Sequence, residues 1–167
     1  MEKVGERFES GEYFLSELIM SAEIFKGVME IVGPKLKKAN VKPLGKIRIG
    51  TVQRDVHYIG KNLVIALLEV AGFEVIDLGE DVPPEKFVEA IREHKPDIVG
   101  MSGLLTLAIE SMKNTVDAIK EAGLRNNVKI IIGGGRVNED AYRYVGADAW
   151  ADNASKGVKI CKELIAG

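Results

Sequence analysis

From residue 46 onward, short β-branched runs alternate with segments whose apolar residues repeat at helical spacing. The first run, 46–52, contains Ile47, Ile49 and Val52, and it precedes a helical pattern over 59–71. Such alternation indicates parallel strands joined by right-handed helical crossovers. We therefore predict an α/β fold of the Rossmann-like (flavodoxin-like) class, with a doubly wound, five-stranded parallel sheet. The expected strands are 46–52, 74–78, 98–102, 129–132 and 147–151, and the expected helices are 59–71, 85–94, 108–122, 138–144 and 154–166.

The first 38 residues have a different pattern from the rest of the chain. They are typical of helices with apolar side chains around much of the circumference, interrupted at Ser10-Gly11. Such helices need cover on more than one side. We expect them to pack on the sheet domain and a bound ligand, or to belong to a larger helical bundle. Pro34 and the polar run 37–45 are expected to form a linker. The predicted division is a helical region 1–38, a linker 39–45 and a sheet domain 46–167.

Composition and charge exclude several classes of protein. Apolar residues make up 46% and charged residues 29% of the chain, and the formal net charge of -2 gives no basic field for nucleic acid. No apolar run reaches the roughly 18 residues of a membrane span, and no signal-peptide pattern opens the chain. Cys161 is the only cysteine, so no intrachain disulfide can form. We expect a cytoplasmic location, with Cys161 as a packing residue.

Three loops with glycine or polar residues follow predicted strands. The first contains Asp55, His57 and Gly60, the second is 101–106, and the third is 132–136. Because open α/β sheets bind ligands at the carboxyl ends of their strands, we expect the three loops to converge. Glycines let the backbone approach a ligand closely, so the loops suit a deep slot for a bulky, mostly apolar group. The predicted slot residues are Ser102, Gly103, Thr106, Gly133, Gly134 and Gly135.

His57 has the features of an oriented metal ligand. One ring nitrogen can face a metal while the other donates a hydrogen bond to Asp55, which fixes the tautomer. The alternative is a structural or solvent-facing histidine, and the glycine triplet can equally form a turn or an anion-binding nest beside Arg136. His94 lies at a polar helix end and is expected on the surface. Ser102 has no evident catalytic base, and two histidines alone make no zinc site.

The three loops also match a set of short motifs in order. The matching residues are Asp55, His57 and Gly60, then Ser102 and Leu104, then Gly133 and Gly134. Together they resemble the Asp-x-His-x-x-Gly, Ser-x-Leu and Gly-Gly signature of cobalamin-binding domains. Each motif alone is common, but all three in this order, each at a strand end, are specific. The resemblance covers residues 46–167 and extends to Lys61-Asn62 after the first motif.

This resemblance implies a cofactor and a role for each residue. In that family cobalamin binds base-off: its benzimidazole leaves cobalt, and a histidine, here His57, takes the lower axial position with Asp55 as its hydrogen-bond acceptor. The displaced nucleotide tail would enter the slot between the second and third loops. The implied cofactor is cobalamin, as methylcobalamin or another corrinoid, with cobalt as the metal. The residues implied in cofactor binding are Asp55, His57, Ile59, Gly60, Ser102, Gly103, Leu104, Thr106, Gly133, Gly134 and Gly135.

The N-terminal region is similar to the end of the four-helix cap of methionine synthase and of methyltransferase corrinoid proteins. The stretch 8–15 matches the cap turn, which implies that Phe8 and Leu15 cover the upper face of the cofactor. The earlier cap helices have no counterpart in this sequence. We therefore expect residues 1–38 to form a partial helical cap.

Three residues of the site depart from the family pattern. Tyr58 and Arg54 stand where many relatives have aspartate and glycine, which changes the loop surface and not the ligand. Ala108 stands where methionine synthase has a serine that extends the proton chain from the histidine and aspartate. Because a methyl group cannot hydrogen-bond, we expect a His57–Asp55 pair rather than a triad.

By this resemblance the chain is a corrinoid carrier of one-carbon metabolism. Loss of the methyl group from cobalt would release His57, and the His57–Asp55 pair would then take up a proton. The expected partners are a substrate-specific methyltransferase, a second methyltransferase with a folate or thiol acceptor, and a reductive activator, with no complete activity in the chain alone. The alternatives are the small subunit of an adenosylcobalamin-dependent mutase, a cobalamin-sensing module, and a cofactor-free interaction domain. The cap sequence favours methyl transfer.

Overall fold

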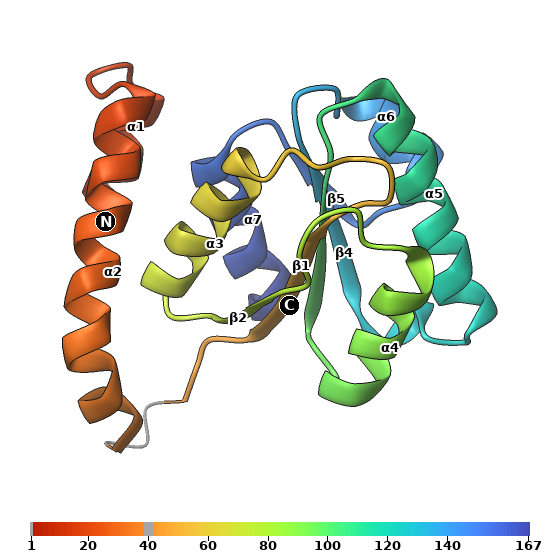
Figure 1. The fold of residues 1–167 in the computed structure, drawn as a ribbon, viewed down its shortest axis with the longest axis horizontal. Helices are drawn as coiled ribbons and strands as arrows, with labels where there is room; N and C mark the ends of the chain where they lie inside the picture. The colour runs from red at the N-terminus through yellow and green to blue at the C-terminus, as the bar shows by residue number, and fades with distance from the viewer. Residues whose placement is uncertain (1, 39–41) are drawn as a thin grey trace.

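The computed structural model describes residues 2–38 and 42–167. These residues form a five-stranded, all-parallel sheet, and Figure 1 shows helices on both of its faces. The strand order is β2-β1-β3-β4-β5, which confirms the predicted fold class. The strands are β1 (Lys46–Thr51), β2 (Glu74–Asp77), β3 (Ile98–Ser102), β4 (Lys129–Gly133) and β5 (Ala149–Ala151). The helices are α1 (Glu2–Glu9), α2 (Leu15–Lys38), α3 (Ile59–Val70), α4 (Pro84–His94), α5 (Thr106–Glu121), α6 (Glu139–Val145) and α7 (Ala154–Ala166), with a 3-10 turn η1 (Arg125–Asn127).

The register of the three central strands brings their carboxyl ends together. Strand β1 pairs with β3 from Ile47 opposite Ile98 to Thr51 opposite Ser102. Strand β3 pairs with β4 up to Ser102 opposite Gly133. The three loops therefore leave the sheet side by side, as the sequence predicts.

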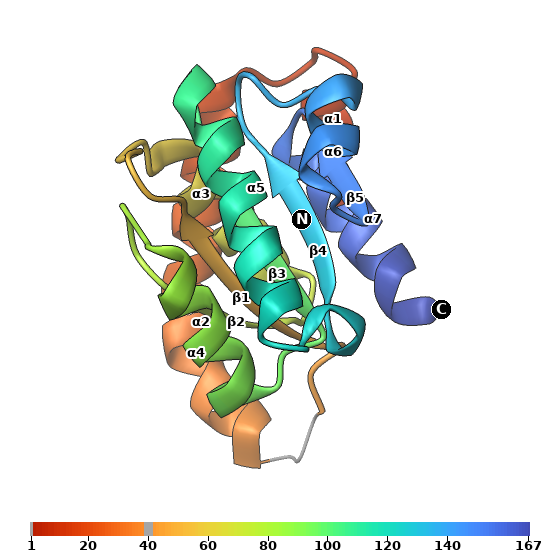
Figure 2. The ribbon, with the colours of Figure 1, turned by 90° about the vertical axis from the view of Figure 1, so that its right-hand side faces the viewer.

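Two layers of helices cover the sheet. Helices α3 and α7 lie on one face, and α4 and α5 lie on the other (Figures 1 and 2). The larger core joins the sheet to α4 and α5 and includes the fully buried Phe87 and Met112. A smaller cluster with Ile47, Leu68 and Cys161 joins it to α3 and α7. Apolar side chains thus cover both faces, which accounts for the nearly continuous apolar runs of the central strands.

Most boundaries of the predicted strands and helices agree with the structure to within one residue, and two differ by two residues. Helix α5 begins at Thr106, two residues before the predicted start. Strand β5 begins at Ala149 rather than 147, because the Asp148 carboxylate accepts the Ile130 N–H at 2.7 Å and takes a place in the strand pairing. Helix α2 continues through Pro34 to Lys38, so the expectation that Pro34 belongs to the linker is wrong. Residues 39–41, three of the seven residues of the predicted linker, are outside the described residues.

The two N-terminal helices pack beside α3 and α7 (Figure 1). Leu18 of α2 is fully buried against Leu67 of α3 and Ala154 of α7, and Val4 and Phe8 of α1 contact the same cluster. Within residues 2–38 and 42–167, no helix is long and apolar enough to span a membrane.

Candidate functional site

Asp55 and His57 form a close pair just beyond the end of β1. The Nδ1 atom of His57 lies 2.8 Å from Oδ1 of Asp55, and the same oxygen accepts the backbone N–H of His57 at 3.0 Å. The other oxygen, Oδ2, accepts the N–H groups of Leu104 and Leu105 at 2.7 and 2.9 Å. Since Leu105 is the N-cap of α5, the buried carboxylate joins the first loop to a helix N-terminus, where negative charge is favoured.

These surroundings keep Asp55 ionised. Burial raises the pKa of this carboxyl, but the hydrogen bonds from Leu105, His57 and Leu104 together outweigh it, and the pKa lies below its ordinary value. Because a carboxylate only accepts hydrogen bonds, Nδ1 of His57 carries the ring proton. The lone pair of the neutral ring is then on Nε2, as in metal-binding histidines that donate to a carboxylate.

The Nε2 atom of His57 is open to a ligand. The His57 side chain is 46% exposed, and Nε2 has no hydrogen-bond partner among the described residues. Large apolar side chains from the same loop and from the start of α5 are also exposed. An exposed apolar patch of this kind on a monomer is typical of a ligand or protein contact. Its residues are Val56, Tyr58, Ile59, Leu104, Leu105 and Leu107.

The loop after β2 fixes the backbone around Asp55. Arg54 adopts a φ of 68°, and its N–H donates to Oδ1 of Asp81 at 2.7 Å. In return the Asp81 N–H donates to the carbonyl of Asp55 at 3.0 Å. Sequence reasoning missed Asp81, because nothing in its own turn indicates a partner 27 residues upstream.

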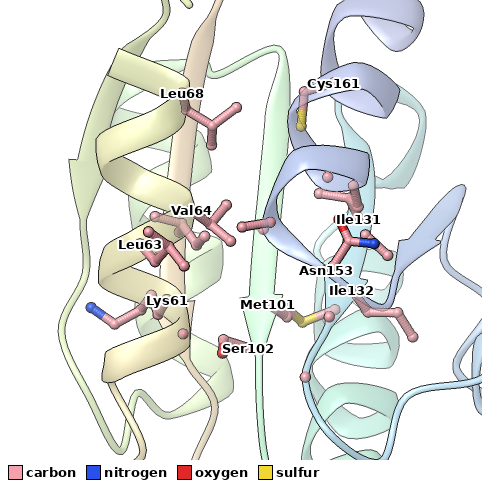
Figure 3. A pocket seen from close by; sticks show the side chains of 18 of the residues that line it. Lys61, Leu63, Val64, Leu68, Met101, Ser102, Ile131, Ile132, Asn153 and Cys161 are labelled. Atoms are coloured by element: carbon pink, nitrogen blue, oxygen red, sulfur yellow. The ribbon is translucent and has the colours of Figure 1, made fainter. Parts of the chain in front are cut away.

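A cavity of about 300 Å³ lies between the sheet and helices α3 and α7 (Figure 3). Strands β1, β3 and β4 form its floor. Figure 3 shows Val64 and Leu68 of α3 on one side and Cys161 of α7 on the other. Phe8 of α1 lines it as well. A mostly apolar cavity with a few polar groups suits a ring system that is held by a small number of anchors.

Glycines hold the second and third loops against each other beside this cavity. The Gly103 N–H donates to the Gly133 carbonyl at 3.1 Å. Gly134 has a φ of 131°, and a Cβ at this position would overlap the carbonyl of Gly103. A Cβ on Gly135 would lie 2.7 Å from Cδ1 of Leu104. Only glycine fits at position 134, and the triplet as a whole leaves backbone rather than side chains along the cavity.

Two other cavity residues have defined ionisation or pairing. Burial raises the pKa of the Cys161 thiol to about 12, so the thiol stays a neutral, apolar part of the cavity wall. The Lys61 ammonium group is buried and pairs with Asp77, and it donates to Oδ1 of Asn62 at 3.3 Å. The sequence assigned Cys161 to packing and gave no sign that α7 forms a cavity wall. The sequence pattern of an apolar helix face is the same whether that face packs on a filled core or borders a cavity.

The predicted site residues fall into two groups. Phe8, Gly60, Ser102 and the triplet Gly133–Gly135 line the cavity. Asp55, His57, Gly103 and Leu104 form the hydrogen-bonded and packed loops beside it.

Three further predicted residues are not part of the cavity lining as described: two lie outside it, and the side chain of the third is not described. Ile59 and Thr106 are the exposed first residues of α3 and α5, and neither lines the cavity. The side chain of Leu15 is outside the described part of the structure. The contacts of these residues with a cofactor stay predictions.

Two family models cover most of the chain. The model described as B12 binding domain matches residues 45–159, and a second model with the same description matches residues 1–32. The chain belongs to the B12-binding domain family. The resemblance inferred from the three loops is thereby confirmed, and membership in this family implies a corrinoid cofactor.

Relatives of this B12-binding chain include corrinoid proteins. It is 39% identical over 167 residues to the trimethylamine corrinoid protein of Methanosarcina barkeri, covering 99% of this chain and 77% of the relative. The crystal structure of a cobalamin-binding protein from Desulfitobacterium hafniense DCB-2 is 50% identical, with a TM-score of 0.84 over 98% of this chain and 77% of that one. One chain in the crystal structure of the methanol:cobalamin methyltransferase complex MtaBC from Methanosarcina barkeri is 32% identical, with a TM-score of 0.81 over 98% of this chain and 62% of that chain.

The donor atoms and spaces of the site fit a corrinoid. Nε2 of His57 is an unpaired nitrogen donor of the type that transition metals bind. The exposed apolar patch around it suits a large, flat ring. The cavity, at about 300 Å³, is at the lower end of the size range of ligand pockets, which matches a nucleotide tail better than a whole corrin.

Proposed function

We propose that this chain is a corrinoid carrier that binds cobalamin base-off, with His57 as the lower axial ligand of cobalt, and that it shuttles a methyl group between two methyltransferases. The proposal rests on the 2.8 Å hydrogen bond between Asp55 and His57, which leaves Nε2 free beside exposed apolar side chains. A bound corrinoid supplies a cobalt centre that accepts a methyl group from one partner and releases it to another.

The chain's own residues position this cofactor. His57 holds cobalt through Nε2, and Asp55 fixes the plane and tautomer of the ring. The Ser102 hydroxyl and the backbone of Gly133–Gly135 contact the tail in the cavity. Gly103 and Leu104 position the second loop against the third, and Ile59, Gly60 and Thr106 complete the predicted contacts.

In this proposal the His57–Asp55 pair also takes up one proton, in addition to the one already on Nδ1. When Nε2 is free of metal it accepts a proton, and the neighbouring carboxylate stabilises the resulting imidazolium. The Oδ2 atom of Asp55 is already bonded to Leu104 and Leu105, and the buried Ala108 offers no polar group. The proton pathway therefore ends at Asp55 or continues through water, as a pair and not a triad.

The N-terminal helices act in this proposal as a partial cap. Residues 1–38 form the cap, 39–45 the linker and 46–167 the cobalamin-binding domain. Phe8 and Leu15 shield the upper face of the cofactor from water. Support comes from the family match over residues 1–32 and from the packing of Phe8 on the cluster around Leu18, which attaches the two N-terminal helices to the sheet domain.

The partners in this proposal are a substrate-specific methyltransferase, an acceptor methyltransferase and a reductive activator. One relative is named for trimethylamine, and another was solved in a methanol:cobalamin methyltransferase complex. These relatives, together with the cap match, favour a methyl carrier over a mutase subunit.

The axial role of His57 can be tested by titrating the purified chain with methylcobalamin and recording absorption spectra. We expect His57→Ala to weaken binding by at least about tenfold, or to leave bound cofactor with the spectrum of cobalt that lacks a lower nitrogen ligand. The matched control is His94→Ala, because His94 lies at the end of α4 and pairs with Glu93. If His57→Ala binds as tightly as the wild type with the same spectrum, the axial assignment is wrong.

A further inference from the structure

The cavity between the sheet and helices α3 and α7 changes in polarity along its length. Its outer part, near the carboxyl ends of the strands, is lined by the polar residues Lys61, Ser102 and Asn153. Figure 3 shows Lys61 and Ser102 toward one end of the cavity and Leu68 and Cys161 at the other. We call this second end the inner end, and its residues line the cavity and also belong to one apolar cluster: Ile47, Val64, Leu68, Ile131 and Cys161.

The inner end offers a ligand few hydrogen-bonding partners. Ile47 and Ile131 lie in strands that pair with neighbours on both sides, so their backbone groups are used within the sheet. Val64, Leu68 and Cys161 lie inside α3 and α7, where the backbone groups bond to each other. Among the described side chains of the inner end, the Cys161 thiol carries the only heteroatom. Burial raises the pKa of this thiol to about 12, so the thiol stays neutral, and it donates and accepts only weakly.

The part of a corrinoid that reaches the inner end is its lower base. In the proposed function, on which this inference rests, the displaced nucleotide tail enters the cavity from the strand ends. The base is the last group of that tail, so the sugar and the phosphate stay in the polar outer part. A flat aromatic ring suits the space between Leu68 and Cys161, since contacts of sulfur with aromatic rings are favourable.

Corrinoids differ in the polarity of this base. Benzimidazole, once displaced from cobalt, has a single free ring nitrogen and otherwise an apolar edge. Adenine has further ring nitrogens and an amino group, and each of these needs a hydrogen-bond partner when it leaves water. The inner end supplies only the Cys161 thiol, so a bound adenine would keep several polar groups unpaired.

We propose that the inner end selects corrinoids with a benzimidazole-type lower base over those with a purine base, and that Cys161 is the residue that sets this preference.

Titration of the purified chain with three corrinoids, followed by absorption, tests the preference. They are cobalamin, the cobamide with adenine as its lower base, and cobinamide, which has no nucleotide. Each dissociation constant is corrected for the fraction of the free cofactor that is base-off, because only that fraction can bind. We expect cobalamin to bind at least about tenfold more tightly than the adenine cobamide, since the buried adenine loses its hydrogen bonds to water. Equal corrected affinities overturn the proposal.

Cobinamide separates this result from a failure of the proposed function. If the cavity holds the base, cobalamin binds more tightly than cobinamide. Cobalamin and adenine cobamide that bind equally, and both more tightly than cobinamide, overturn the preference and leave the carrier function intact. Equal binding of all three places the base outside the cavity, which overturns the preference together with the assignment of the cavity to the nucleotide tail.

Substitution of Cys161 tests the selecting residue. Cys161→Ser replaces the thiol by a hydroxyl of similar size, which is a full donor and acceptor. We expect the preference for cobalamin over the adenine cobamide to fall by at least about threefold, which is what one new hydrogen bond supplies. The matched control, Cys161→Ala, adds no polar group and is expected to keep the preference of the wild type. The base-off fractions of the free cofactors cancel when preferences are compared between proteins.

Circular dichroism of each variant shows whether it is folded. A folded Cys161→Ser variant with the same preference as Cys161→Ala overturns the role of Cys161. Val64→Thr adds a hydroxyl to the inner end from α3 and is a second test, which does not depend on the folding of the Cys161 variants. It is expected to lower the preference in the same direction, and an unchanged preference overturns the account of the inner end.

Discussion

The same central strands carry a filled core on one face and a cavity on the other. On the α4–α5 face, Phe87, Met112 and Ile119 are fully buried and pack on the sheet. On the α3–α7 face, small residues such as Gly157 and Ala154 stand in the helix wall, and a cavity of about 300 Å³ remains. Protein interiors are normally close-packed. The contrast teaches that one face supplies stability while the other is kept open for a ligand.

The filled face should be the more sensitive to loss of a side chain. Phe87→Ala is expected to lower the free energy of unfolding by about 3–5 kcal/mol, since it removes a fully buried aromatic ring from a packed core. Urea unfolding of the cofactor-free chain measures this. Cobalamin affinity, corrected for the folded fraction, should be unchanged. A loss of stability below about 1 kcal/mol would show that this face is not close-packed.

On the α3–α7 face, a side chain that fills the cavity should weaken cobalamin binding. A Cβ on Gly157 would lie 3.6 Å from the Ala151 Cβ, an ordinary contact, so a longer side chain can extend into the cavity. Gly157→Leu is expected to weaken cobalamin binding by at least about tenfold, which corresponds to about 1.4 kcal/mol. Stability should be unchanged or higher, because a helical glycine is replaced. Titration followed by absorption and urea unfolding measure the two effects.

The control for this change is Gly157→Ala, which gains helix propensity without filling the cavity. It is expected to bind cobalamin as the wild type does. If Gly157→Leu binds normally as well, the cavity does not hold the nucleotide tail.

The smallest effect concerns Asp55, which links the two faces through Leu105 of α5 and His57 of the loop before α3. Its pKa in the folded chain lies below its ordinary value near 4. The stability that it contributes is therefore present above pH about 4 and is lost as the pH falls toward the folded-state pKa. In that acid range, Asp55→Asn should flatten the fall of the unfolding free energy by at most about 1.4 kcal/mol per pH unit. Equal acid slopes in the two proteins would show that the pKa is not lowered.

The sheet is predictable because each strand is a local apolar run. The expected strand 98–102 coincides with β3, and its neighbours differ by few residues. Strand β5 is shorter than expected because a side chain, Asp148, replaces part of the backbone pairing. Such a substitution depends on where Ile130 lies in space and leaves no mark in the local pattern.

The site is predictable where the residues in contact are close together in the sequence. Asp55 and His57 are two residues apart, so their pairing can be expected from spacing alone. The tie between Arg54 and Asp81 joins distant loops and could not be predicted. Thr106 starts α5 directly after the two N–H groups that Asp55 binds, and it does not line the cavity, so its contact with a cofactor stays a prediction.

Electron paramagnetic resonance of the chain loaded with the Co(II) form of cobalamin tests the central claim most directly. Protein containing ¹⁵N-labelled histidine is combined with unlabelled cofactor, so the splitting of each cobalt line identifies the lower nitrogen. The account predicts a doublet, from the ¹⁵N of His57, that persists in His94→Ala and disappears in His57→Ala. A triplet from the cofactor's own unlabelled benzimidazole, or lines without nitrogen splitting, would contradict it.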